Sequence, residues 1–198
     1  MSVAPEHAEP PQPKRIWPTP PPEGWTADDL DTLPDLPPHT ELIDGSLVFV
    51  SPQTEFHQLA MRILERGLLR TIPDDLDVRR EMTILIDPKQ RPEPDLIVIR
   101  ADTVTGPEVT KYPADGVVLA VEVVSADSED RDRETKPLKY AKAGIQHFWR
   151  VENVRGKPAV FVFELDPATK TYVTTGVHHD RLKLSVPYDI DIDLNATR

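Results

Sequence analysis

Two apolar segments, each with the pattern of a buried strand, carry a carboxylate within them. Asp95 begins the run DLIVI at residues 95–99, and Glu122 lies inside VVLAVEVV at residues 117–124. Both runs are typical of buried strands. A lone carboxylate in such a run costs several kcal/mol to desolvate, so each should be paired, protonated or bound to a cation. Two of them indicate one shared metal ion.

A lysine-rich segment follows the second acid. Residues 125–135 have the composition of a loop, and residues 136–144 have a helical pattern that ends at Gly144. Lys136, Lys139 and Lys142 recur every three residues, a spacing that usually gives a solvated helix face. Lys136 differs, because Pro137 belongs in the first turn of a helix and so places Lys136 near its start, beside the acids. Two acids and a lysine suit phosphodiester hydrolysis, in which a cation polarises the phosphate and the lysine stabilises developing charge.

The nature of the metal follows from the available ligands. The chain has no cysteine, and hard oxygen ligands favour Mg²⁺ or Mn²⁺ over zinc. Asp95, Glu122 and the backbone carbonyl of Val123 are the predicted ligands. His178 and His179 are neighbours in a strand-like run and would point to opposite faces, so we expect surface histidines there. For Glu122 the alternative is a buried ion pair, and for Asp95 it is a turn-ending aspartate.

Length and charge restrict the class of protein. With 198 residues the chain fits one folded domain, and it contains neither an apolar run long enough to span a membrane nor a signal pattern, so we expect a cytoplasmic protein. The net charge of -11 argues against nucleic-acid binding. However, part of the acid load lies in residues 28–31 and 189–193, which we expect away from any groove. Arg62, Arg66 and Arg70 form a helical row that serves either solubility or phosphate contact.

The order of predicted elements indicates an α/β domain with a mixed central sheet flanked by helices. Residues 1–22 are rich in proline and predict a disordered tail before a domain at residues 23–198. Thr26 should cap a short helix over residues 26–33, and Asp44-Gly45 predicts a hairpin between residues 40–43 and 46–50. An amphipathic helix is expected over residues 54–71. Strands are expected over residues 78–86, 95–100, 117–125, 147–152, 159–165 and 172–178.

Taken in order, these residues resemble a known family. The strings ELIDG at 41–45, PD at 94–95, EVVS at 122–125 and FWRVE at 148–152, with His57, Asp132, Lys136, Tyr140 and Gly144, are similar to the restriction endonuclease family once catalogued as a domain of unknown function. That family belongs to the PD-(D/E)xK nuclease superfamily. The resemblance covers residues 25–194.

The resemblance implies a restriction-endonuclease-like fold and divalent-metal-dependent cleavage of DNA. By this resemblance, Asp95 and Glu122 are expected to form the active site. Glu41 and His57 match positions that complete the site in many members of the family. The superfamily lysine normally follows two residues after the second acid, where this chain has Val124. The resemblance places the lysine on the next helix, at Lys136.

The sequence therefore predicts a nuclease in which Asp95 and Glu122 hold Mg²⁺ or Mn²⁺ and Lys136 stabilises the reacting phosphate or orients the attacking water. Two alternatives remain open: a catalytically inactive DNA- or protein-binding domain with the same fold, and a small-molecule hydrolase that uses the same metal. We also expect a homodimer, since paired active sites related by a two-fold axis suit cleavage of both DNA strands. Residues 161–163 and the late strands offer the apolar surface for it.

Overall fold

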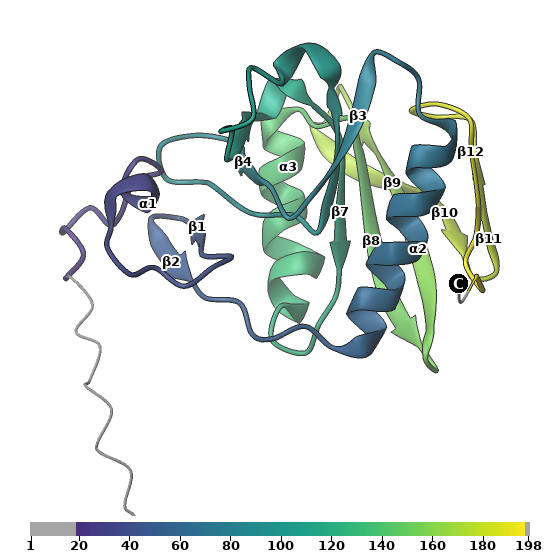
Figure 1. Cartoon of the computed structure of the whole chain (residues 1–198), viewed down its shortest axis with the longest axis horizontal. Helices are drawn as coiled ribbons and strands as arrows, with labels where there is room; N and C mark the ends of the chain where they lie inside the picture. The colour runs from purple at the N-terminus through teal and green to yellow at the C-terminus, as the bar shows by residue number, and fades with distance from the viewer. Residues whose placement is uncertain (1–18, 197–198) are drawn as a thin grey trace, which may run out of the picture.

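A six-stranded mixed sheet forms the centre of the computed structural model, which describes residues 19–196 (Figure 1). Only the pair β7 and β8 is parallel, joined through helix α3 (Lys136–Ala143), and every other neighbouring pair is antiparallel. This is the predicted mixed α/β fold. The strands lie in the order β10 (Thr171–His178), β9 (Lys157–Asp166), β8 (His147–Val154), β7 (Val117–Val123), β5 (Leu96–Arg100) and β3 (Leu76–Arg80).

Helix α2 (Glu55–Thr71) covers one face of the sheet together with a hairpin of β11 (Arg181–Leu184) and β12 (Ile190–Asp193) (Figure 1). The side chains on this face alternate along the strands, as Leu96 and Val98 do in β5, because successive residues of a strand point to opposite faces. Gly67 lets α2 approach β12 closely, since a Cβ there would lie 2.5 Å from the Ile192 side chain.

Helix α3 covers the opposite face. Ile97, Ile99, Ala120 and Phe148 from the sheet pack there against Tyr140 of α3. Two short strands, β4 (Thr83–Leu85) and β6 (Lys111–Pro113), form a separate parallel pair, and 3-10 turns η1 (Ala101–Thr103) and η2 (Ala114–Gly116) follow β5 and β6. The two packed faces make the three-layer arrangement expected of an α/β domain.

The predicted hairpin and the first long helix are confirmed. Strands β1 (Glu41–Ile43) and β2 (Ser46–Val48) pair in antiparallel fashion around Asp44 and Gly45, whose φ angles of 50° and 73° are those of a tight two-residue turn. Thr54 caps α2 by accepting a hydrogen bond from the backbone N–H of His57 at 3.3 Å. This cap holds the backbone of His57 in the first turn of α2 and so sets the direction in which its side chain points.

Two local predictions for the first half of the chain are wrong. The strand expected over residues 78–86 is two strands, β3 and β4, because Glu81 adopts a left-handed conformation with φ of 52° and turns the chain between them. The first helix, α1 (Asp29–Thr32), is shorter than expected and its N-cap is Asp28, not Thr26. The Thr26 backbone N–H and hydroxyl donate instead to the Asp29 carboxylate, at 2.7 and 2.8 Å.

The segment before α3 is helical where a loop was expected. A π-helical turn, η3 (Arg131–Thr135), leads directly into α3, and the Lys136 N–H donates to the carbonyl of Arg131, five residues earlier. Pro137 lacks an N–H and would collide with a carbonyl of an ordinary α-turn, so the wider turn accommodates it. The helix ends as predicted at Gly144, with φ of 86°.

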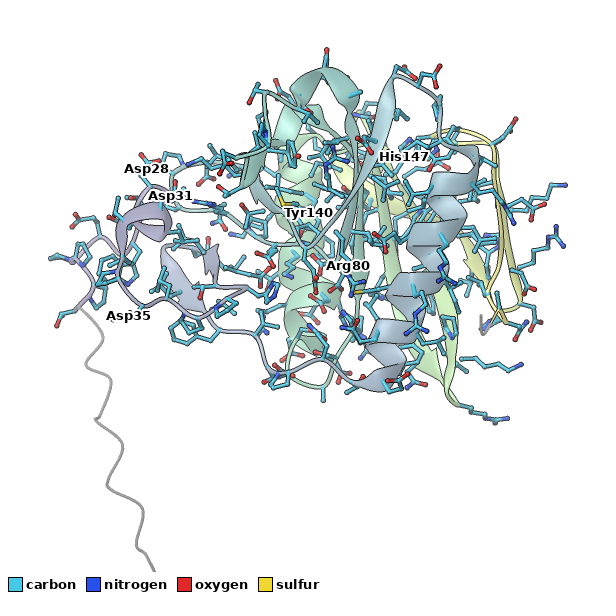
Figure 2. The ribbon with its side chains drawn as sticks, in the orientation of Figure 1. Asp28, Asp31, Asp35, Arg80, Tyr140 and His147 are labelled. Atoms are coloured by element: carbon cyan, nitrogen blue, oxygen red, sulfur yellow. The ribbon has the colours of Figure 1, made fainter. Side chains whose placement is uncertain are left out.

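Most of the predicted tail, residues 1–18, lies outside the described residues. The acidic segment around α1 lies at one end of the molecule, where Figure 2 shows Asp28, Asp31 and Asp35 far from Tyr140 and the central sheet. Asp31 pairs there with Arg91 at 2.7 Å and with Lys111 at 2.5 Å. Within residues 19–196, no helix has both the length and the apolar composition needed to cross a membrane.

Candidate active site

The register of two central strands brings Asp95 and Glu122 together. β5 runs antiparallel to β7 with Leu96 opposite Val121, so the next residues outward, Asp95 and Glu122, meet at the end of this pair. The Val123 N–H donates a 2.6 Å hydrogen bond to Asp95 Oδ2. Because side chains alternate along β7, Glu122 points to the face that α3 covers. Glu122 therefore faces the helix that carries the lysines.

Lys136 lies among three buried carboxylates. Its Nζ is 2.9 Å from Glu41 Oε1, 3.0 Å from Glu122 Oε2 and 3.4 Å from Asp132 Oδ1. All four side chains are at least 95% buried. The structure thus brings three predicted site residues, Glu41, Glu122 and Lys136, into direct contact, and it adds Asp132.

Tyr140 completes the contacts of Glu122. Its hydroxyl donates a 2.6 Å hydrogen bond to Glu122 Oε1, so each oxygen of this carboxylate has a donor. Asp132, Lys136 and Tyr140 are spaced by four residues, which places them along one side of the helical segment. No role was predicted for Asp132 or Tyr140. The four-residue spacing from Lys136 is the signal in the sequence that could have identified both.

The cluster holds more negative than positive charge. Burial raises the pKa of Glu122 well above its usual value, and the nearby acids Asp132, Asp95 and Glu41 add to the rise, against the lowering effect of Lys136. Burial likewise raises the pKa of Asp132. For Lys136 burial acts to lower the pKa, but the surrounding carboxylates raise it well above the ordinary value of a lysine. One ammonium therefore faces three carboxylates away from water, a balance that favours a further cation or proton.

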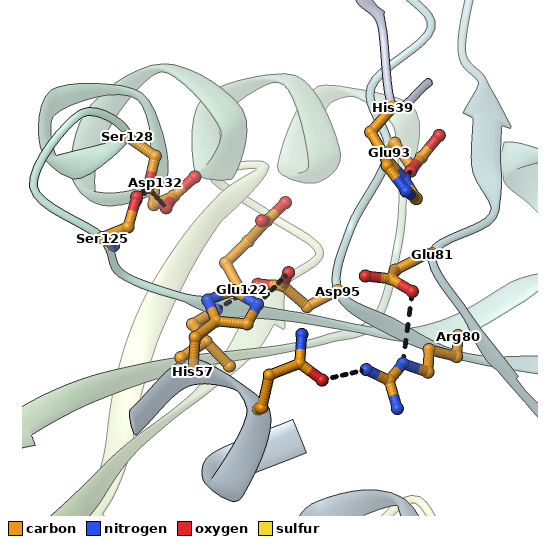
Figure 3. Close-up of polar contacts among 12 residues, drawn as sticks. His39, His57, Arg80, Glu81, Glu93, Asp95, Glu122, Ser125, Ser128 and Asp132 are labelled. Atoms are coloured by element: carbon orange, nitrogen blue, oxygen red, sulfur yellow. Dashed lines mark hydrogen bonds and ion pairs between the residues drawn. The ribbon is translucent and has the colours of Figure 1, made fainter. Parts of the chain in front are cut away.

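His57 contacts Asp95 from the first turn of α2. Its Nε2 lies 2.8 Å from Asp95 Oδ1, while the other oxygen of the carboxylate receives the Val123 N–H (Figure 3). The ring is buried, and neither Nδ1 nor Nε2 forms a well-oriented hydrogen bond within residues 19–196. The imidazole therefore lies against the Asp95 carboxylate at ion-pair distance, with both ring nitrogens inside the protein.

Glu41 reaches the cluster from the β1–β2 hairpin. The hairpin is tied to the segment before β5 by paired backbone hydrogen bonds between Leu42 and Arg91, at 3.0 and 2.8 Å. The Glu93 N–H then donates to Glu41 Oε1 at 2.7 Å. These bonds hold the carboxylate of Glu41 against Lys136. A residue far in sequence from β5 and β7 is thereby held beside Glu122.

These side chains line a cleft of about 390 Å³. At its rim, the His39 ring contacts the Glu93 carboxylate at 2.5 Å, and Glu81 lies nearby beside Arg80 (Figure 3). No role was predicted for these rim residues. Every residue predicted for the site lines the cleft: Glu41, His57, Asp95, Glu122, Val123 and Lys136.

Other candidates from the sequence lie elsewhere. Lys139, on the same helix as Lys136, pairs with Asp44 of the hairpin turn and does not line the cleft. His178 and His179 belong to the end of β10 and the following turn, also outside it. Arg62, Arg66 and Arg70 are exposed on α2 and line a separate groove against β12. The choice of Lys136 over Lys139 as the lysine beside the acids is consistent with these positions.

The carboxylate oxygens and the Val123 carbonyl are hard ligands of the kind that Mg²⁺ and Mn²⁺ prefer. Among residues 19–196, no three His, Asp or Glu side chains are already arranged to hold a metal ion. The donor set nevertheless fits such a cation, because carboxylates outnumber cations in the buried cluster and each oxygen of Asp95 and Glu122 faces a single donor, which leaves it a second lone pair.

The fold and the acid-lined cleft place this chain among mixed α/β proteins of nuclease-like fold. The structure matches a crystal structure described as a "putative nuclease belonging to DUF820 from Anabaena variabilis ATCC 29413", with a TM-score of 0.61 and 16% identity over 82% of this chain and 89% of that one. The chain belongs to the Uma2 family, described as "Putative restriction endonuclease", whose model matches residues 27–197. No curated protein matches the sequence.

Proposed function

We propose that the protein is a divalent-metal-dependent endonuclease that hydrolyses phosphodiester bonds in DNA. Membership of the family and the nuclease-like fold support the class of reaction. The observation that carries the proposal is the buried cluster, in which Glu41, Glu122 and Asp132 surround the single ammonium of Lys136 beside Asp95. An uncompensated excess of buried carboxylates is costly for a purely structural site, and it suits one that takes up a cation.

Asp95 and Glu122 would hold Mg²⁺ or Mn²⁺ through carboxylate oxygens, with the Val123 carbonyl as a further ligand. When bound, such an ion supplies charge stabilisation at the phosphate and lowers the pKa of a bound water. Both proposed carboxylates are held in fixed orientations, Asp95 by His57 and the Val123 N–H, and Glu122 by Lys136 and Tyr140. Such fixed partners around a ligand improve both metal affinity and activity.

The remaining residues have distinct roles in this proposal. Lys136 carries the positive charge that stabilises the phosphate as negative charge develops on it, or that orients the attacking water. Glu41 holds the ammonium of Lys136 from the hairpin side, and His57 keeps Asp95 in one orientation. These contacts place the acids and the lysine before substrate arrives, so little reorganisation is needed during the reaction.

A cleavage assay tests the proposal. Native protein should cut plasmid or oligonucleotide DNA with Mg²⁺ or Mn²⁺, and Asp95→Asn should abolish cutting because it removes a ligand charge. Asp102→Asn is the matched control, since Asp102 is exposed and lies after β5, outside the cleft. Absence of cutting on every substrate, or equal cutting by the native protein and Asp95→Asn, would show that the proposal is wrong.

We propose a homodimer as the assembly that cuts both strands, with residues 161–163 of β9 and the late strands as its apolar surface. Phe161 and Phe163 of β9 are partly buried, and the guanidinium of Arg150 lies 4.9 Å and 5.5 Å from the centres of their rings. Light scattering measures the mass directly. A monomer at tens of micromolar would contradict this part of the proposal and leave the cleavage chemistry unaffected.

A further inference from the structure

Four basic side chains line the cleft, and three of them already have acidic partners. His39 contacts Glu93, His57 contacts Asp95, and Lys136 is surrounded by three carboxylates. Arg131 is the fourth. Within the described part of the chain, its guanidinium forms no ion pair and no hydrogen bond, and its Nε is buried without an acceptor. The guanidinium of Arg131 therefore has no direct partner within residues 19–196, and its charge acts at longer range on Asp127, whose pKa it helps to lower.

The acids nearest to Arg131 in sequence are engaged with other groups. Asp132 accepts a hydrogen bond from the Ser128 hydroxyl and lies 3.4 Å from the ammonium of Lys136. Asp127 is hydrogen-bonded with Ser51, on a different segment of the cleft lining, and it feels the charge of Arg131 without forming an ion pair with it. A buried N–H without an acceptor is unfavourable on its own, so a bound anion that accepts from the Nε of Arg131 would satisfy it.

The rest of the cleft repels a phosphodiester. Its acids outnumber its bases, and as long as no metal ion neutralises the carboxylates around Lys136, this ammonium offers little net attraction to an approaching anion. The arginine row of α2 lies in another groove, beside β12. A guanidinium presents a rigid fork of donors that matches two phosphate oxygens, and among the cleft residues Arg131 alone has this group free.

We propose that Arg131 binds a backbone phosphate of the nucleic-acid substrate and positions the strand over the acids. This inference rests on the proposed nuclease function and adds the residue that first attracts the strand. η3 places Arg131 directly before Asp132 and one turn before Lys136, so a phosphate held by Arg131 lies beside the cluster. The π-helical turn therefore matters for phosphate binding, because it sets the direction in which the Arg131 side chain points into the cleft.

The test measures binding of a fluorescent DNA duplex by anisotropy, in EDTA so that no cleavage occurs, over about 50 to 200 mM salt. Arg131→Ala should weaken binding about tenfold at low salt and lower the slope of log K against log salt by about one, the effect of a single lost phosphate contact. Arg131→Lys should retain the slope and lose part of the affinity, since it keeps the charge and not the fork. Arg155→Ala, in the β8–β9 turn outside the cleft, is the matched control and should bind as the native protein does.

The outcomes separate this inference from the proposed function. Equal binding and equal slope for the native protein and Arg131→Ala would overturn the role of Arg131 and leave the nuclease proposal intact. Equal losses for Arg131→Ala and Arg155→Ala would also overturn it, because they would reflect only net charge. If the native protein binds no duplex and no single strand at low salt, both the DNA substrate and the role of Arg131 are refuted. Arg131→Ala loses no ion pair, and matching melting temperatures confirm that it folds.

Discussion

The Tyr140 hydroxyl donates a 2.6 Å hydrogen bond to Glu122 Oε1, one turn of helix away from the lysine that holds the other oxygen of the same carboxylate. This contact joins a strand residue to a helix residue that follows it by eighteen positions. Burial, together with the charge of Glu122, raises the pKa of Tyr140 well above its ordinary value, so the phenol stays protonated and remains a donor. The carboxylate that we assign to the metal is thereby held in one orientation.

Tyr140→Phe removes this donor and leaves the ring in place. We expect a loss of about 1.5–3 kcal/mol in the free energy of unfolding, because a buried charged acceptor loses its hydrogen bond. Cleavage should slow by about tenfold or more, since Glu122 is no longer fixed. Urea unfolding and the cleavage assay measure the two effects. Tyr172→Phe is the control, because the Tyr172 hydroxyl donates to the Ile145 carbonyl outside the cleft. Equal activity of the two variants would refute a positioning role for Tyr140.

Lys136 and Lys139 should differ sharply when each is replaced by alanine. Lys136→Ala leaves three buried carboxylates without their cation and should cost about 3–5 kcal/mol of stability. Lys139 pairs with Asp44 on the surface, where Lys139→Ala should change stability by less than about 1 kcal/mol. Chemical denaturation compares them.

Cleavage gives a second comparison of the two lysines, at a temperature where both variants are folded. Lys136→Ala should slow cleavage by about a hundredfold or more, and Lys139→Ala by much less. If Lys139→Ala proves the slower enzyme, the assignment of the lysine is wrong, even though the structure places Lys136 among the acids.

The elements that the sequence predicts well are those whose local pattern decides their structure. Helix α2 has an apolar stripe and a threonine cap, and the β1–β2 hairpin has Asp44-Gly45 at its turn, so both are predictable without tertiary contacts. The break at Glu81 is not, because a glutamate carries no local signal for a left-handed conformation. The π-helical turn before Lys136 likewise depends on how Pro137 is accommodated in the folded chain.

In the candidate site, too, some residues have a local signal in the sequence and others do not. Asp95 and Glu122 stand out in the sequence because a carboxylate in an apolar strand is unfavourable without a partner. Glu41 was found only through the resemblance, since nothing in its local sequence indicates that the hairpin is tied through Leu42 and Arg91 to the segment before β5. His39 and Glu93 meet across 54 positions of sequence, and such a contact has no local signal.

Magnesium should stabilise the folded protein if the acids bind it. A ligand that binds only the folded state at about 100 times its Kd adds about 2.7 kcal/mol, so the melting temperature should rise with Mg²⁺ and not with NaCl at equal ionic strength. Asp95→Asn and Glu122→Gln should lose this rise, and Asp102→Asn should keep it. A rise that persists in Asp95→Asn would place the ion elsewhere. Differential scanning fluorimetry gives this readout without any DNA.

The stability contributed by His39 should depend on pH. The hydrogen bond to Glu93 raises the pKa of His39, although partial burial acts against it. Because the pKa of His39 is higher in the folded state than in the unfolded state, the protonated ring stabilises the folded protein. This contribution is complete below about pH 6.5, the ordinary pKa of histidine, and is lost as the pH rises through the folded-state pKa. His39→Asn should therefore lower the free energy of unfolding more at about pH 5.5 than at about pH 9.

Asparagine is the informative replacement at this position, because His39 has φ of 60° and asparagine tolerates that conformation better than alanine. The charge of the imidazole is then removed with little added backbone strain. His179→Asn, at an exposed histidine outside the cleft, is the control, and it should show no comparable dependence on pH. Urea unfolding at the two pH values measures the difference between each variant and the native protein. A loss in His39→Asn that is the same at both pH values would mean that His39 acts by packing at the rim of the cleft, and not through a charge held by Glu93.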